Sequence, residues 1–78
     1  MANDEPLQQR YYNFLMERVK NDRFPSHQLL DRIEASFSTP DQVIEYVSML
    51  LDKTDESWYP SHQLLDRIER GMSLVVAA

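Results

Sequence analysis

The chain has no cysteine, and it contains one glycine, one tryptophan and two histidines among 78 residues. Without cysteine, neither a disulfide nor a thiolate metal site can form. Two histidines are too few for a self-contained structural zinc site of the usual kind. We therefore expect no cofactor and no bound metal. A chain of this length then depends on tight helix packing or on self-association for its stability.

Positive charge is also scarce. Eight Lys and Arg stand against thirteen Asp and Glu, which gives a formal net charge of −5. Nucleic-acid binding needs a cationic surface that displaces counterions from phosphate, and binding to an anionic membrane surface needs the same sign of charge. We therefore expect neither nucleic acid nor membrane as a partner, whereas a basic protein partner stays open.

Long hydrophobic runs are absent too. The longest apolar runs have four to five residues, far fewer than a membrane span requires. The first six residues, MANDEP, are acidic and polar and do not resemble a signal peptide. Together with the lack of cysteine, these features predict a cytoplasmic protein.

An exact internal repeat is the most prominent feature that is present. The ten residues Pro25–Glu34, PSHQLLDRIE, recur as Pro60–Glu69 at an offset of 35 residues. A looser match extends upstream and aligns Tyr11–Arg23 with Tyr46–Trp58. Repeats of this period commonly encode a pair of helices.

Periodicity and capping signals predict four helices, over about residues 5–21, 26–37, 40–53 and 61–70. Ser26 and Ser61 stand where N-caps belong, and Thr39–Pro40–Asp41–Gln42 has the pattern of a capping box with proline at the first helical position. Gly71 stands where the last helix should end. No segment shows the alternation typical of a strand.

The expected buried faces follow from the helical spacing. We expect the first helix to bury Leu7, Tyr11, Phe14, Leu15 and Val19, and the third to bury Val43, Val47, Leu50 and Leu51. We expect the repeated helix to bury Leu29, Leu30, Ile33 and Phe37 in its first copy, and Leu64, Leu65, Ile68 and Met72 in its second.

These patterns define the predicted fold class: all-α, with four short helices forming two tandem helical hairpins related by approximate twofold pseudo-symmetry. The chain is predicted to be a single domain over residues 1–78. Repeat unit one covers about 5–37, repeat unit two about 40–72, and the tail is 73–78. The apolar tail, SLVVAA, could cap the bundle, add to a partner or fray, and its two final alanines resemble C-terminal signals read by bacterial AAA+ proteases.

Each copy of the repeated helix carries a polar edge beside its apolar stripe. His27, Asp31 and Glu34 have the spacing i, i+4 and i+7 and share one side of the helix. Such residues can bind metal when two helices converge, but this spacing is not that of a recognised metal-binding helix, so we favour a solvated edge. Ser26 beside His27, with Asp31, contains the residue types of a hydrolase triad. Neighbouring side chains on a helix diverge, so a catalytic role is not expected.

Aromatic residues precede both repeated helices. Phe24 comes before Pro25, and Trp58 and Tyr59 come before Pro60. The favoured interpretation is a hydrophobic lock on the turn. An exposed binding patch is the alternative, with Trp58 as its most promising residue, because Trp, Tyr and Arg are enriched in binding hot spots.

The identity of the two copies extends to residues expected to point outward, which core packing alone does not explain. We therefore predict a small non-enzymatic protein–protein interaction module that binds a protein partner, or itself as a homodimer, through these polar edges. The alternative is a small acidic inhibitor or immunity-like protein, of the kind encoded by phages or mobile elements, that occupies a basic site on its target. The predicted partner-binding residues are His27, Asp31, Arg32, Glu34, Trp58, His62, Asp66, Arg67 and Glu69.

Overall fold

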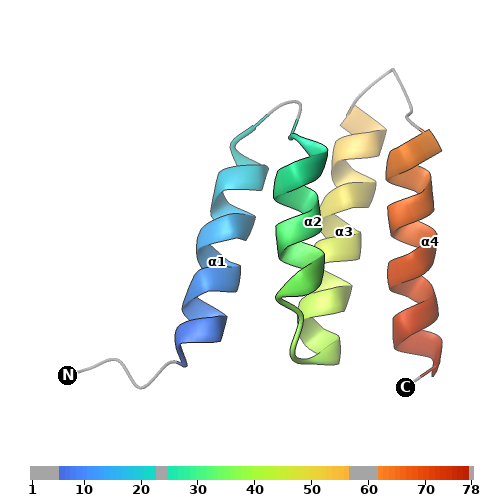
Figure 1. Ribbon diagram of the computed structural model, residues 1–78. Helices are drawn as coiled ribbons and strands as arrows, with labels where there is room; N and C mark the ends of the chain where they lie inside the picture. Colours follow the sequence, from blue (N-terminus) through green and yellow to red (C-terminus); the bar gives the residue numbers. More distant parts are fainter. Residues whose placement is uncertain (1–5, 23–24, 57–61, 78) are drawn as a thin grey trace. The chain divides into compact units, whose positions relative to one another are not determined.

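The computed structural model describes residues 6–22, 25–56 and 62–77. Within them the chain is all-helical, with four helices and no strand, as the sequence predicts. The helices are α1 (Leu7–Lys20), α2 (His27–Ala35), α3 (Pro40–Glu56) and α4 (His62–Ala77). The chain divides into two compact units, Met1–Ser38 and Thr39–Ala78, which we call unit 1 and unit 2. Figure 1 shows an antiparallel pair of helices in each.

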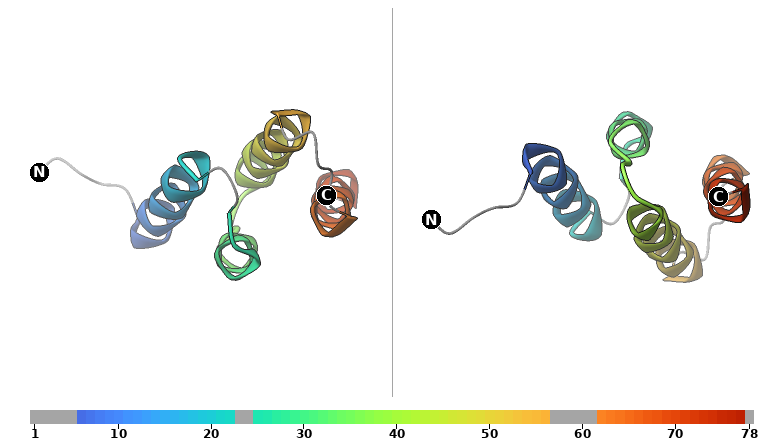
Figure 2. Two further views of the ribbon diagram at one scale, coloured as in Figure 1. Left: turned by 90° about the horizontal axis from the view of Figure 1, so that it is seen from above. Right: turned by 90° about the horizontal axis from the view of Figure 1, so that it is seen from below.

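In unit 1, α1 packs against α2, and the two helices lie side by side in every view (Figures 1 and 2). The buried side chains of this unit are Tyr12, Leu15, Met16, Val19, Leu30 and Ile33. The ring of Tyr12 also meets that of Phe37, with centroids 6.4 Å apart and planes tilted by 52°. This aromatic pair joins the middle of α1 to the residues just after α2.

The buried face of α1 differs from the expected one. Leu15 and Val19 are buried as predicted, but Leu7, Tyr11 and Phe14 are exposed. The first turns of α1 contain two overlapping apolar patterns, and packing against α2 selects the one that begins at Tyr12. Because Tyr12, Leu15, Met16 and Val19 are buried, Leu7, Tyr11 and Phe14 are left on the surface.

Hydrogen bonds join the start of α1 to the end of α2. The side-chain amide of Gln8, near the start of α1, donates to the backbone carbonyl of Ser36, which comes directly after α2. The Ser36 hydroxyl in turn donates to the carbonyl of Ile33 at 2.8 Å, and Ser36 is itself buried. The Ile33 carbonyl also accepts from the backbone N–H of Ser36 at 2.9 Å, so the end of α2 is closed by both backbone and side-chain hydrogen bonds.

In unit 2, α3 begins as predicted. The Thr39 hydroxyl accepts from the backbone N–H of Gln42 at 3.2 Å, and Pro40 is the first helical residue. The helix continues to Glu56, about one turn beyond the expected end near Lys53. Its buried apolar side chains are Val43, Tyr46, Val47, Met49 and Leu50. Leu51, predicted to be buried, is exposed.

Helix α4 does not end at Gly71, contrary to the prediction, and continues to Ala77. Gly71 is buried, and its φ is not in the left-handed region that a glycine cap would use. A Cβ at this position would overlap the Cγ2 of Val47 on α3. The glycine is therefore a point of close helix–helix approach, and half-buried Val75, one turn later, lies on the same side of α4.

The second copy of the apolar stripe is less buried than the first. Ile68 is buried, as is Ile33 in unit 1, but Leu65 and Met72 are exposed although the sequence predicted both to be buried. Identical residues therefore have different surroundings in α2 and α4.

Candidate functional site

The polar edge of α2 begins at a well-formed helix start. Ser26 is the N-cap, and its hydroxyl accepts from the backbone N–H of Leu29 at 3.1 Å. This confirms the predicted cap and uses the serine hydroxyl in helix initiation, which is a structural role. The equivalent Ser61 lies outside the described residues. His27 is then the first residue of α2, and it is exposed.

Three of the predicted binding residues in α2 are exposed: His27, Asp31 and Arg32. Glu34 is half-buried, so it contributes less surface. His27 and Asp31 are four residues apart and share one side of the helix. The exposed part of this edge therefore offers an imidazole, a carboxylate and a guanidinium within two turns.

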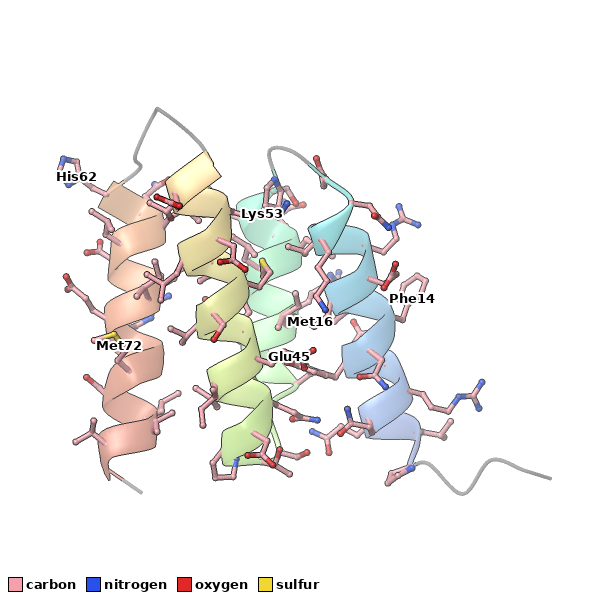
Figure 3. All side chains as sticks on the ribbon, turned by 180° about the vertical axis from the view of Figure 1, so that it is seen from behind. Phe14, Met16, Glu45, Lys53, His62 and Met72 are labelled. Carbon is pink, nitrogen blue, oxygen red and sulfur yellow. The ribbon has the colours of Figure 1, made fainter. Side chains whose placement is uncertain are left out.

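In α4, His62, Asp66 and Glu69 are exposed, but Arg67 retains only 7% of its accessible surface. Figure 3 shows His62 at the start of α4, pointing away from α3. The burial of Arg67 contradicts the expectation that it points outward. It immediately precedes Ile68 in the core, and the long hydrocarbon part of an arginine packs readily against apolar neighbours. Arg67 is thus part of the structure of unit 2 and not of its exposed edge.

The aromatic residues before the repeated helices, Phe24, Trp58 and Tyr59, lie outside the described residues. Trp58 therefore stays a predicted binding residue on sequence grounds. Across the part of the chain that the structure describes, no group of three or more His, Cys, Asp or Glu side chains is placed to hold a metal ion. The exposed imidazole, carboxylate and guanidinium groups of the polar edges can form ionic and hydrogen-bonding contacts with another molecule.

Sequence reasoning missed the exposed apolar residues. Leu7, Tyr11 and Phe14 on α1 were assigned to the core, and the structure exposes all three. In Figure 3 the ring of Phe14 points away from α2. The signal that could have found them is the competing pattern Tyr12, Leu15, Met16 and Val19, which has the regular spacing i, i+3, i+4 and i+7.

A second missed feature lies on α3. An open depression of about 450 Å³ is lined by Leu51, Asp52, Thr54 and Asp55. The Oγ1 of Thr54 is buried and has no hydrogen-bond partner there. Among the described residues that line it, one apolar side chain lies beside two carboxylates, which suits a ligand group with both apolar and cationic parts.

Comparisons of the chain with protein-family models, with curated proteins and with solved structures give no match. Among the described helices, none has the length and apolar character needed to cross a membrane. The function is therefore inferred from the residues of this chain alone.

Proposed function

We propose that the protein is a small non-enzymatic interaction module built from two related helix pairs with approximate twofold pseudo-symmetry. It binds a protein partner through the polar edges of the repeated helices. The observation that carries the proposal is the exposure of identical residues at matched positions: His27 with His62, and Asp31 with Asp66. Identical sequence in the buried stripe has a packing explanation, whereas identical exposed side chains favour a shared binding role.

The proposed binding surface is limited to exposed side chains. Arg67 is removed from it, and half-buried Glu34 lies at its margin. The described part of the surface proposed for binding comprises His27, Asp31 and Arg32 on α2, with His62, Asp66 and Glu69 on α4. Trp58, which lies outside the described residues, stays a predicted binding residue. Two matched patches of this kind suit a partner that presents the same feature twice, since two weak contacts on one partner reinforce each other.

The test reverses one carboxylate in each patch. Asp31→Lys/Asp66→Lys should weaken partner binding by about tenfold or more, because it replaces attraction with repulsion at both contacts. The partner is first captured with the wild-type protein and identified, and its affinity is then measured by titration calorimetry. Circular dichroism should show unchanged helicity, because both residues are exposed.

Glu17→Lys/Glu45→Lys is the matched control. It makes the same change in net charge at two exposed helical positions, one in each unit. We expect its affinity to stay close to that of the wild type. If the Asp31/Asp66 variant binds as tightly as the control, the polar edges are not the binding surface.

A second function is favoured by the charge distribution. Unit 2 contains seven acidic and three basic residues, against six and five in unit 1. Such an acidic unit could act as an inhibitor that occupies a basic site on another protein. In that case the captured partner is basic, and its affinity falls steeply as the salt concentration rises. A salt-insensitive complex would exclude this function.

A further inference from the structure

The exposed apolar residues of α1 form one stripe. Leu7, Tyr11 and Phe14 have the spacing i, i+4 and i+7, which places them on one side of the helix. Phe14 is 57% exposed, and the guanidinium carbon of Arg18, one turn later, lies 5.8 Å from its ring centroid. We call Leu7, Tyr11 and Phe14 the α1 stripe. Contiguous exposed apolar surface of this kind commonly marks a binding site.

Unit 2 presents a second exposed apolar surface. Ile44 and Leu51 on α3 are exposed, as are Leu65 and Met72 on α4. Each residue of a helix is rotated by about 100° about the helix axis from the one before it. Counted in the direction of the chain, Ile44 and Leu51 lie about 40–100° around α3 from Val43 and Val47, which face Gly71. Counted in the same way, Leu65 and Met72 lie about 100–120° around α4 from Gly71. The two helices run antiparallel (Figure 1), so a rotation in the chain direction turns both helices toward the same side of the pair. The four side chains therefore lie on one side of the α3–α4 pair. We call these four residues the α3–α4 face.

The internal repeat relates the two surfaces to buried positions. Tyr11 of the α1 stripe is 44% exposed, whereas Tyr46, its equivalent at the 35-residue offset, is fully buried. In the same way Phe14 is exposed and its equivalent Met49 is buried.

The α3–α4 face shows the reverse pattern. Leu51 and Leu65 are exposed, while their equivalents in unit 1, Met16 and Leu30, are buried. Apolar positions that are exposed in one unit are thus buried at the equivalent position of the other unit. In arrays of related helix pairs each repeat contacts only its neighbours, so exposed apolar positions of this kind are ones that a neighbouring helix pair could cover.

The charges beside the two surfaces are also complementary. Helix α1 contains three basic residues and one acidic residue, whereas α3 contains five acidic residues and one basic residue. Next to Phe14 stands the Arg18 guanidinium, and next to Leu51 stand the carboxylates of Asp52 and Asp55 in the open depression on α3. In a contact between these surfaces, an aromatic ring beside a cation would face an apolar side chain beside two anions.

We propose that the occupant of the α1 stripe is the α3–α4 face of a second copy of this chain. The contact is heterologous, since one copy uses the α1 stripe and the other uses the α3–α4 face. Such an interface leaves one unused surface on each end of a dimer and therefore permits further addition of copies. This proposal uses surfaces distinct from the polar edges and stands independently of the function proposed above.

The first experiment measures the mass of the pure protein by sedimentation equilibrium between about 10 μM and about 1 mM, the range of weak protein association. The average mass should rise with concentration and pass beyond that of a dimer. Phe14→Glu and Leu51→Glu should each lower the association constant by about tenfold or more, because each places a charge in one of the two apolar surfaces.

The decisive experiment mixes the two variants. Phe14→Glu keeps a working α3–α4 face, and Leu51→Glu keeps a working α1 stripe. An equimolar mixture should therefore form a one-to-one dimer at concentrations where each variant alone is largely monomeric, and it should form nothing larger. Leu74→Glu is the matched control: Leu74 is 55% exposed against 50% for Leu51, and it lies about 200° around α4 from Met72. This variant should associate like the wild type.

Three results would overturn the proposal. The first is a wild-type protein that stays monomeric at every concentration. If Phe14→Glu then abolishes binding to a different protein, the α1 stripe binds that protein and not a second copy of this chain. The second is association that neither variant weakens. The third is a dimer that the mixture of variants does not restore, which would indicate a symmetric interface. Thermal unfolding of each variant confirms that it remains folded, since all three positions are exposed.

Discussion

At the scale of single residues, the two copies of the repeat show how surroundings decide the role of a side chain. Arg32 is exposed on α2, whereas Arg67, in an identical stretch of sequence, is buried on α4. Leu30 and Leu65 show the opposite change, from buried to exposed. The same local sequence forms a helix in both places, and its neighbours determine which side of that helix is covered.

Thr54 gives a prediction at this scale. Its Oγ1 is buried without a hydrogen-bond partner, and the equivalent residue in unit 1 is buried Val19. A buried hydroxyl without a partner carries a desolvation penalty of about 1–3 kcal/mol. Thr54→Val removes the hydroxyl and keeps the branched shape, so the free energy of unfolding should rise by about 1 kcal/mol. Urea denaturation followed by circular dichroism measures the change.

Thr39→Val is the control for this substitution. It makes the same chemical change at a threonine whose hydroxyl accepts from Gln42 in the cap of α3. Loss of that cap should lower the free energy of unfolding by about 1 kcal/mol, the opposite sign. A destabilised Thr54→Val variant would show that the Thr54 hydroxyl has a bonding role in the folded protein.

At the scale of the helices, the contact between Gly71 and Val47 sets how closely α4 approaches α3. Gly71→Ala gains up to about 1 kcal/mol of helix propensity, but its new Cβ overlaps a γ-methyl of Val47. Valine is stiff at χ1, so the overlap is relieved only by a shift of the helices, at about 1–3 kcal/mol. We expect a net loss of up to about 2 kcal/mol in the free energy of unfolding, measured by chemical denaturation.

A double-mutant cycle isolates this contact. Val47→Ala opens space opposite position 71, so adding Gly71→Ala to that background should be neutral or stabilising. If Gly71→Ala costs the same in both backgrounds, its effect does not come from the contact with Val47.

Local signals predicted the helices well because capping depends on adjacent residues. Ser26 and Thr39 form the expected hydrogen bonds, and Pro40 opens α3. Apart from the end of α3, which lies at Glu56 and not near Lys53, the errors concern contacts between helices. The face of α1 depended on which of two overlapping patterns meets α2, and the continuation past Gly71 depended on Val47 of another helix.

The candidate site was predicted in part for the same reason. Exposure at His27, Asp31, His62 and Asp66 follows from their place beside the apolar stripe. The burial of Arg67 could not follow from a sequence that is identical around exposed Arg32. The exposed apolar residues were missed because the face of α1 was assigned to the wrong pattern.

At the scale of the whole molecule, charge is distributed unevenly along the chain. The acidic excess lies mostly in unit 2, where α3 alone contains five acidic residues, while α1 is basic. In head-to-tail contact this asymmetry is attractive, because the α1 stripe of one copy meets the acidic surroundings of Leu51 in another.

Salt should therefore weaken self-association. Raising the ionic strength from about 0.05 M to about 0.5 M shortens the Debye length several-fold, and the association constant should fall with it. Arg18→Glu should also weaken association, and Arg18→Glu/Asp52→Lys should restore part of it by exchanging the two charges. Sedimentation at each salt concentration measures these effects. Association that strengthens with salt would show that the charge contact does not contribute.

The close approach at Gly71 also bears on how the chain finds its fold. Residues Pro25–Glu34 and Pro60–Glu69 are identical, so this stretch by itself does not distinguish the two helices as partners during folding. The second residue after each copy differs: Ser36 in the first and Gly71 in the second, where any Cβ would overlap Val47 of α3. The third residue differs as well: Phe37 supplies the ring that meets Tyr12, and the second copy has Met72 there. We therefore expect these two positions after the repeat to bias each copy of the helix toward its own partner as the chain folds.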